Sequence, residues 1–199
     1  MNDLDKRKYN KLVNAEINVT ITENTEDRLI VDIYVSDNIE PYVRHRDRRG
    51  RKGKYDPLAE YKIYLGDTVK SKLTEAGITE ILEGELSMHV KYYKPFNKDH
   101  SEMFKLMALA HEIRPTVKPD SDNILKTIQD AFNNKIFNDD IQINTVSLEK
   151  FYYNEPRTYI RIIQNKTNNK NRNSCKGKRV NKILIEEYNK KINKINLGF

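Results

Sequence analysis

Alternation of apolar and polar residues predicts a series of β-strands along the chain. Residues 28–35 are rich in β-branched side chains, which favour strands. Residues 84–93 carry an apolar side chain at every second position, which is typical of a strand with one buried face. Two more strands are expected at 143–153 and 158–164, joined as a hairpin through the short segment between them. The polar N-terminal stretch predicts only a short strand, at 17–21.

Apolar residues spaced by three and four predict helices between these strands. One stripe follows residues 58–73 despite Gly66, and we expect it to pack in the core or in a dimer interface. A second helix is expected from Asp122 as its N-cap to the asparagines that follow Phe132. Residues 103–110 predict a short helix that either packs across a dimer partner or closes the core. This order of elements predicts an α/β (α+β) fold, a single domain in which helices pack on a small mixed β-sheet.

The length of 199 residues suits one domain with a real core and is too short for two of ordinary size. We expect this domain over residues 1–164. The remaining segment, 165–199, reads as a linker followed by a basic amphipathic helix at about 179–194. The sequence has no run of 18 apolar residues and no signal peptide pattern, and its single cysteine, Cys175, has no partner for an internal disulfide. We therefore expect a soluble, cytoplasmic protein that does not bind membranes.

The net charge of +7 is concentrated in two segments. Residues 166–199 contain ten Lys and Arg against two Glu, so this tail carries the whole net excess. Residues 44–54 contain seven basic residues, two glycines and a single acid, Asp47, which is typical of a flexible loop that contacts phosphates. The alternative is a merely solvated loop. The residues predicted to bind DNA are Arg44, Arg46, Arg48, Arg49, Arg51, Lys52, Lys54 and Lys118.

Carboxylates are concentrated in the segment that leads into the second predicted helix. Asp120 and Asp122 are two residues apart, and on extended backbone after Pro119 they would project in the same direction. On the helix, Lys126 and Asp130 follow Asp122 at intervals of four, so a lysine lies one turn from the acid pair. The chain then returns within a few residues to a second acid pair, Asp139 and Asp140.

Such a cluster predicts a divalent cation, because neighbouring carboxylates resist joint ionisation unless a cation neutralises them. Oxygen ligands without nearby Cys or His favour Mg²⁺, with Mn²⁺ as an alternative, over zinc. A metal ion with a lysine beside it is an arrangement used for phosphoryl transfer. Taken singly, each of these residues has a structural explanation as a helix cap, a turn residue or a solvated ion pair. Taken together, they favour catalysis.

Four elements in this order resemble the RusA-like endonucleases, homodimeric Holliday junction resolvases common in phages and prophages. They are the segment from Lys118 to Asn123, then Lys126, then Asp130-Ala131-Phe132, and finally Asp139-Asp140-Ile141-Gln142. The resemblance covers roughly residues 85–163 well and the preceding region more loosely. Some members carry a run of arginines before the first acid, whereas this chain has only Arg114 and Lys118 there.

The resemblance implies a role for each matching position. Asp120, Asp122 and Asp140 would be the catalytic carboxylates that bind metal, Lys126 the catalytic lysine, and Asp130 and Asp139 supporting acids, with Asp139 also among the metal ligands. It also implies a small RusA-like fold, a homodimer and branched DNA with four arms as the substrate.

The leading hypothesis is therefore a metal-dependent endonuclease that resolves four-way DNA junctions by paired phosphodiester hydrolysis. One alternative is a nucleotidyl transferase, which also uses Asp-x-Asp, although no glycine-rich phosphate loop lies near the acids. The other is a non-catalytic nucleic-acid-binding protein in which the basic loop and tail bind and the acids are structural. In that last case Asp122→Asn would leave all function intact.

Overall fold

The computed structural model describes residues 3–47, 54–166, 186, 189 and 190. The chain divides into two compact units, Met1–Asn169 and Lys170–Phe199. The description below concerns the first unit. The predicted linker and basic tail helix are described at only a few positions. Four residues of the basic segment lie outside the described residues, namely Arg48, Arg49, Arg51 and Lys52. Among the described helices, none has the length and apolar character needed to cross a membrane.

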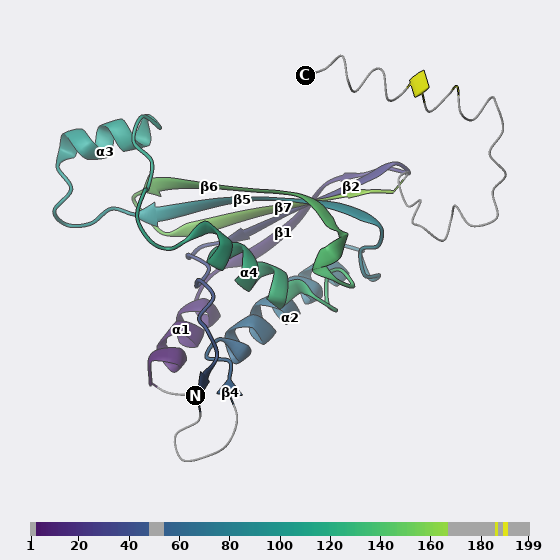
Figure 1. Ribbon diagram of the computed structural model, residues 1–199, viewed down its shortest axis with the longest axis horizontal. Helices are drawn as coiled ribbons and strands as arrows, with labels where there is room; N and C mark the ends of the chain where they lie inside the picture. Colours follow the sequence, from purple (N-terminus) through teal and green to yellow (C-terminus); the bar gives the residue numbers. More distant parts are fainter. Residues whose placement is uncertain (1–2, 48–53, 167–185, 187–188, 191–199) are drawn as a thin grey trace. The chain divides into compact units, whose positions relative to one another are not determined.

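A five-stranded mixed sheet forms the centre of this unit, in the order β1-β2-β7-β5-β6. Neighbouring strands are antiparallel except β5 and β6, which are parallel. The strands are drawn in Figure 1, and their bounds are Ile17–Asn24 for β1, Arg28–Val35 for β2, Glu85–Pro95 for β5, Ile143–Tyr153 for β6 and Arg157–Asn165 for β7. The mixed α/β fold predicted from the sequence is confirmed, as are these strand positions.

The predicted hairpin between the last two strands is wrong. β6 and β7 are consecutive in the chain, but β5 lies between them in the sheet. Val90 of β5 pairs in parallel with Leu148 of β6 and antiparallel with Ile160 of β7. The three residues after β6 therefore carry the chain across the end of β5, and both strands gain a central partner that a hairpin would not have supplied.

Three helices lie on one side of the sheet (Figure 1): α1 (Asp3–Val13), α2 (Ala59–Glu75) and α4 (Ser121–Phe132). The predicted helices at 58–73 and 122–132 are confirmed as α2 and α4, and the short helix at 103–110 is confirmed as α3 (Glu102–Leu109). The sequence did not predict α1. Leu12 is its only buried hydrophobic residue, so its apolar period is too weak to recognise in a polar segment.

The core lies between the sheet and these helices. Alternate residues of β5 and β7 are buried, and the predicted stripe of α2 faces them. The members of that stripe are Leu58, Tyr61, Leu65, Val69 and Leu73, all of which are at least 96% buried. The opposite face of the sheet carries the polar and aromatic residues of the same strands, so the core is built on one side of the sheet only.

Helices α2 and α4 cross at Gly66. A methyl group at this position would overlap the carbonyl oxygen of Ala131 and lie 2.7 Å from Cδ of Lys135. Lys135 reinforces the crossing, since its Nζ donates to the carbonyl of Ile63 at 2.9 Å and pairs with Asp67 at 2.6 Å. Glycine is thus required here by close approach of the two helices, which fixes α2 against the helix that carries the acids.

The basic segment begins and ends in a pair of two-residue strands, β3 (Arg46–Asp47) and β4 (Lys54–Tyr55). They pair antiparallel through Arg46 with Tyr55 and Asp47 with Lys54. Arg44 and Lys54 are exposed. The base of the predicted loop is therefore a short β-ladder placed directly before α2.

Candidate active site

The acid-bearing helix begins two residues earlier than the predicted cap implies. Its N-cap is Asp120, with extended backbone angles (φ −71°, ψ 141°), and Ser121 is its first residue. The prediction of Asp122 as N-cap is wrong, as is the expectation that both acids lie on extended backbone. Asp122 instead lies in the first helical turn, where a negative charge is favoured by the helix dipole. The Asp120 side chain makes no capping hydrogen bond, so its carboxylate remains exposed.

Two lysines from the sheet hold the loop that precedes Asp120. Nζ of Lys94, on β5, donates to the carbonyl of Lys118 at 2.9 Å. Nζ of Lys150, on β6, donates to the carbonyls of Val117 at 3.0 Å and Pro119 at 3.2 Å. The side chain of Lys118 is exposed. The parallel strand pair thus positions the start of α4.

On α4, Lys126 and Asp130 follow Asp122 along one face at intervals of four residues. Nζ of Lys126 lies 4.5 Å from the centre of the Tyr42 ring, a cation–π contact. The Tyr42 amide donates to the carbonyl of Asn123 at 2.8 Å, which fixes this segment beside the helix. Tyr42 therefore orients the lysine, a role that the sequence did not indicate.

The second acid pair is held by a short 3₁₀ helix, η1 (Asp140–Gln142). Oδ1 of Asp139 accepts from the amide of Ile141 at 3.0 Å, so one oxygen of this carboxylate caps η1. The Gln142 side chain accepts from the amides of Asn138 and Asp139 and donates to the carbonyls of Leu82 and Gly84. These contacts fasten the acid pair to the segment that enters β5.

Charged residues of α4 affect the pKa of Asp140. Burial, followed by a hydrogen bond with Asp139, raises the pKa of the Asp140 carboxyl. The charges of Asp139 and Asp130 raise it further, while the positive charge of Lys126 opposes them. Asp140 therefore interacts electrostatically with Asp139, Asp130 and Lys126, which come from two separate parts of the sequence.

Asp120 and Asp122 lie towards the other end of the helix. At 1.5 Å per residue, Asp122 is about 12 Å along the axis from Asp130. Within the described part of the chain, no three Asp, Glu, His or Cys side chains stand close enough to form a ready metal site. The chemistry of the donors nevertheless suits a hard divalent cation, because these groups are carboxylates, and burial together with the neighbouring acids raises the pKa of Asp140.

A lysine that sequence reasoning missed joins this cluster to α2. Nζ of Lys62 forms ion pairs with Asp56 and, at 3.0 Å, with Asp130, and its side chain is only 13% exposed. Burial lowers the pKa of Lys62, but the hydrogen bonds to Asp56 and Asp130 outweigh it, so that the pKa is raised overall. Nε2 of His45 lies 4.0 Å from Asp56. No sequence signal marks this network, since Lys62 and Asp130 are 68 positions apart.

A helix that carries acids and a lysine, together with a second acid pair from a later segment of the chain, is typical of proteins that act on phosphodiesters. The family model described as endodeoxyribonuclease RusA matches residues 38–163, which is more than half of the chain. The chain belongs to the RusA endodeoxyribonuclease family, and the resemblance noted from the sequence is confirmed. Membership implies endodeoxyribonuclease activity and DNA as the substrate.

The chain is also similar to the uncharacterized protein YqaN of Bacillus subtilis (strain 168). The two are 36% identical over 112 residues, which span 51% of this chain and 79% of that protein. The matched family region contains Tyr42, Asp56 and Lys62 as well as every predicted acid.

Replacing Lys62 with Met is expected to lower the free energy of unfolding by about 2–3 kcal/mol, because two partly buried carboxylates would lose their shared cation. Urea unfolding followed by circular dichroism measures this. Lys62→Arg is the matched control, which keeps the charge and is expected to retain most of the stability. Equal stability of Lys62→Met and wild type would show that the Asp56–Lys62–Asp130 network contributes little to the fold.

Proposed function

We propose that this protein is a metal-dependent, structure-selective endonuclease that resolves four-way DNA junctions by paired phosphodiester hydrolysis as a homodimer. The observation that carries the proposal is that the chain belongs to the RusA family, and it is supported by the electrostatic interaction of Asp140 with Asp139, Asp130 and Lys126. Such a substrate belongs to recombination and repair, in the cytoplasm of a bacterial or phage-infected cell.

The family resemblance makes Asp120, Asp122 and Asp140 the ligands of Mg²⁺, or Mn²⁺ in its place, with Asp139 as a further ligand. In the structure Asp120 and Asp122 lie at the other end of α4 from Asp130, so these carboxylates would have to come closer together to share one ion. When bound, the metal supplies an activated water and charge neutralisation at the phosphate. Asp120 has the freedom this role needs, because its carboxylate is exposed and makes no capping bond.

Lys126 is the residue we assign to the developing negative charge on the attacking or leaving oxygen. Its ammonium group is exposed but held over the Tyr42 ring, so it is oriented without being neutralised by a direct ion pair among the described residues. Asp130 is a supporting acid, because its carboxylate is already engaged by Lys62. This division separates the residues that meet the substrate from those that hold the helix in place.

DNA would be contacted beside the acids by Lys118 and by the basic segment at β3 and β4. Arg44 precedes that ladder and Lys54 belongs to it, and both residues are exposed. Arg46 forms part of the ladder, while Arg48, Arg49, Arg51 and Lys52 of the same segment are proposed from the sequence alone. Contacts to phosphates provide affinity without sequence preference and weaken as salt increases. A two-fold symmetric dimer would match the two-fold symmetry of a four-way junction.

The test is cleavage of an end-labelled synthetic four-way junction with Mg²⁺, with Mn²⁺ and with chelator, beside a linear duplex of the same sequence. The expected result is symmetric nicks in two opposed strands, present with either metal, absent with chelator and absent from the duplex. Ligation of the products checks for 5′-phosphate and 3′-hydroxyl ends. Tight junction binding without cutting under any of these conditions would contradict the proposal and favour a non-catalytic binding protein.

A further inference from the structure

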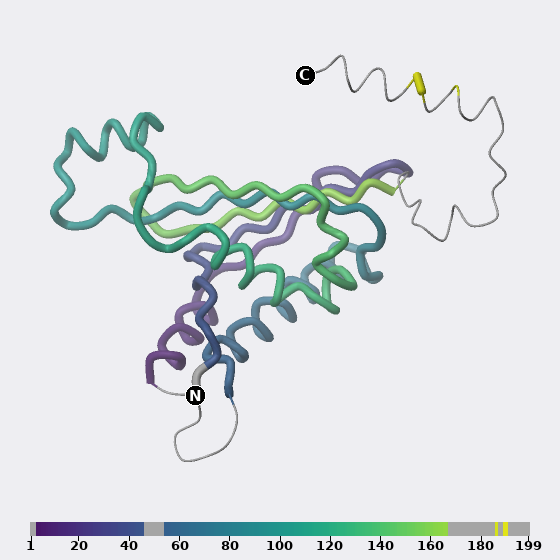
Figure 2. Tube along the Cα trace, viewed as in Figure 1, coloured from purple at the N-terminus to yellow at the C-terminus, as the bar shows by residue number. Residues whose placement is uncertain are grey.

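Three lysines gather around the short loop that leads into α4. Lys118 lies in this loop, while Lys94 belongs to β5 and Lys150 to β6. In Figure 2 the teal trace passes from α3 across the ends of these two strands before it enters α4. The three lysines come from separate parts of the sequence, so the fold assembles this cluster and no motif marks it.

Strand register places both strand lysines on the side of the sheet that α4 covers. Lys150 pairs with Tyr92, which belongs to the buried core. Lys94 is two residues after Tyr92 and therefore points to the same face. Since β5 and β6 are parallel, the two lysines lie near the carboxyl ends of neighbouring strands, where both reach the loop before α4.

The hydrogen bonds that these lysines make leave both charge and donors available. Lys94 donates to one carbonyl of the loop and Lys150 donates to two. An ammonium group has three N–H donors, so two remain on Lys94 and one on Lys150. Carbonyl oxygens carry no net charge, and they therefore do not neutralise either lysine.

Acids do not neutralise these three lysines either. Among the ion pairs of the described residues, none includes Lys94, Lys118 or Lys150, although Asp120 follows the loop directly. Other described lysines do form ion pairs with acids, namely Lys8, Lys11, Lys62, Lys105 and Lys135. The loop before α4 thus combines three positive charges that lack a partner of opposite charge in the described part of the chain.

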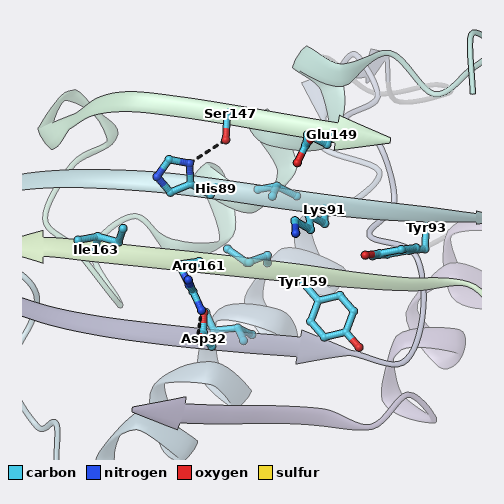
Figure 3. A pocket seen from close by; sticks show the side chains of 12 residues that line it. Asp32, His89, Lys91, Tyr93, Ser147, Glu149, Tyr159, Arg161 and Ile163 are labelled. Carbon is cyan, nitrogen blue, oxygen red and sulfur yellow. Dashed lines mark hydrogen bonds and ion pairs between the residues drawn. The ribbon is translucent and has the colours of Figure 1, made fainter. Parts of the chain in front are cut away.

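Two arginines on the opposite face of the sheet differ from these lysines. Figure 3 shows Arg161 beside Asp32, whose two oxygens accept from it at 2.6 and 2.8 Å. Glu149, on the same face, accepts from Arg114 at 3.1 Å. Both arginines already have an acid partner, so they offer less to an anionic ligand than the three lysines do.

We propose that Lys94, Lys118 and Lys150 bind a phosphate of the DNA backbone beside the phosphodiester that is cut. Three ammonium groups around one short loop repel one another, and a phosphate relieves this repulsion while its oxygens accept the remaining donors. The loop continues into Asp120, so a strand held there lies next to the first acid. The proposal rests on the proposed function for the identity of its ligand. A contact to phosphate adds affinity without sequence preference.

The test is binding of a linear duplex in chelator at several salt concentrations, which excludes metal and cleavage. The double variant Lys94→Gln/Lys150→Gln removes both charges but keeps side-chain N–H donors for the loop carbonyls. Loss of one phosphate contact is expected to lower the slope of log K against log[salt] by about 0.9 and to weaken binding roughly tenfold at about 0.1 M salt. Lys94→Arg/Lys150→Arg keeps the charges and should retain the wild-type slope. Lys70→Gln, at an exposed position of α2, is the control and should also retain it.

Lys118→Gln serves as a second variant, because this side chain is exposed and none of its contacts hold the described fold together. It should lower the affinity and the slope in the same direction without changing the melting temperature. An unchanged slope in Lys118→Gln, or in a folded Lys94→Gln/Lys150→Gln variant, would overturn the proposal and leave the strand lysines as supports of the loop. Equal losses in the Gln and Arg double variants would overturn it too, since charge would then not matter. A wild type that shows the expected binding changes but cuts no junction would instead contradict the proposed function and leave the phosphate site standing.

Discussion

Replacing Asp140 with Asn is expected to lower the rate of junction cleavage on the order of 10³-fold or more, because the site would lose a charged metal ligand. Asp122→Asn is expected to have an effect of the same order. Single-turnover cleavage with Mg²⁺ measures both. The matched control is Asp99→Asn, an exposed acid in the loop before α3, for which the rate should stay within about twofold of wild type.

Junction binding separates a catalytic role of these acids from a structural one. Asp140→Asn removes a negative charge from a crowded acid cluster, so binding measured with Ca²⁺ or chelator should stay equal or become tighter. The fold should also be retained, since repulsion with Asp139 and Asp130 is relieved. If Asp140→Asn cuts at the wild-type rate, or if its loss of activity merely follows a loss of folded protein, the acids are not the catalytic centre.

Replacing Gly66 with Ala is expected to lower the free energy of unfolding by about 2–3 kcal/mol, even though alanine favours helices more than glycine does. The added methyl group would overlap the Ala131 carbonyl oxygen, a backbone atom that can move only if α2 and α4 separate. For a domain of this size the melting temperature should fall by about 5–10 °C. Thermal unfolding followed by circular dichroism measures the change.

Lys70→Ala is the control for Gly66→Ala, since it introduces the same residue at an exposed position one turn further along α2. Its melting temperature should remain within about 2 °C of wild type. Gly66→Ala should also slow cleavage, because Lys62 on α2 holds Asp130 on α4. A variant as stable as wild type would mean that the two helices can move apart at little cost.

The helices that carry the core could be predicted because each has a strong apolar period of its own. The stripe from Leu58 to Leu73 and the apolar face of α4 depend only on neighbouring residues, and both were found. Helix α1 was missed because it buries few side chains, chiefly Leu12. Its helical form depends on packing against α2 through contacts such as Tyr9 with Tyr64, whose ring centres are 5.7 Å apart.

Pairing of the last two strands could not be predicted, because strand patterns do not specify partners. A short connection between β6 and β7 favoured a hairpin, but β5 supplies both strands with hydrogen bonds. The same limit applies to the site. Asp120, Asp122, Lys126, Asp130 and the acids at 139 and 140 were predicted from local motifs. Tyr42 contacts Lys126, and Lys62 joins Asp130 to Asp56, only through tertiary contacts that no motif marks.

The central place of β7 has a consequence for how the protein is made. β7 is the last strand of the sheet in sequence, yet it alone joins the β1–β2 ladder to the β5–β6 ladder. Until residues 157–165 leave the ribosome, a growing chain has two separate strand ladders with unpaired edges. The sheet surface on which α2 and α4 pack is incomplete during that time. The core and the acid cluster can therefore close only after almost the whole domain has been synthesised, and the exposed edges of the two halves are its most aggregation-prone surfaces during that interval.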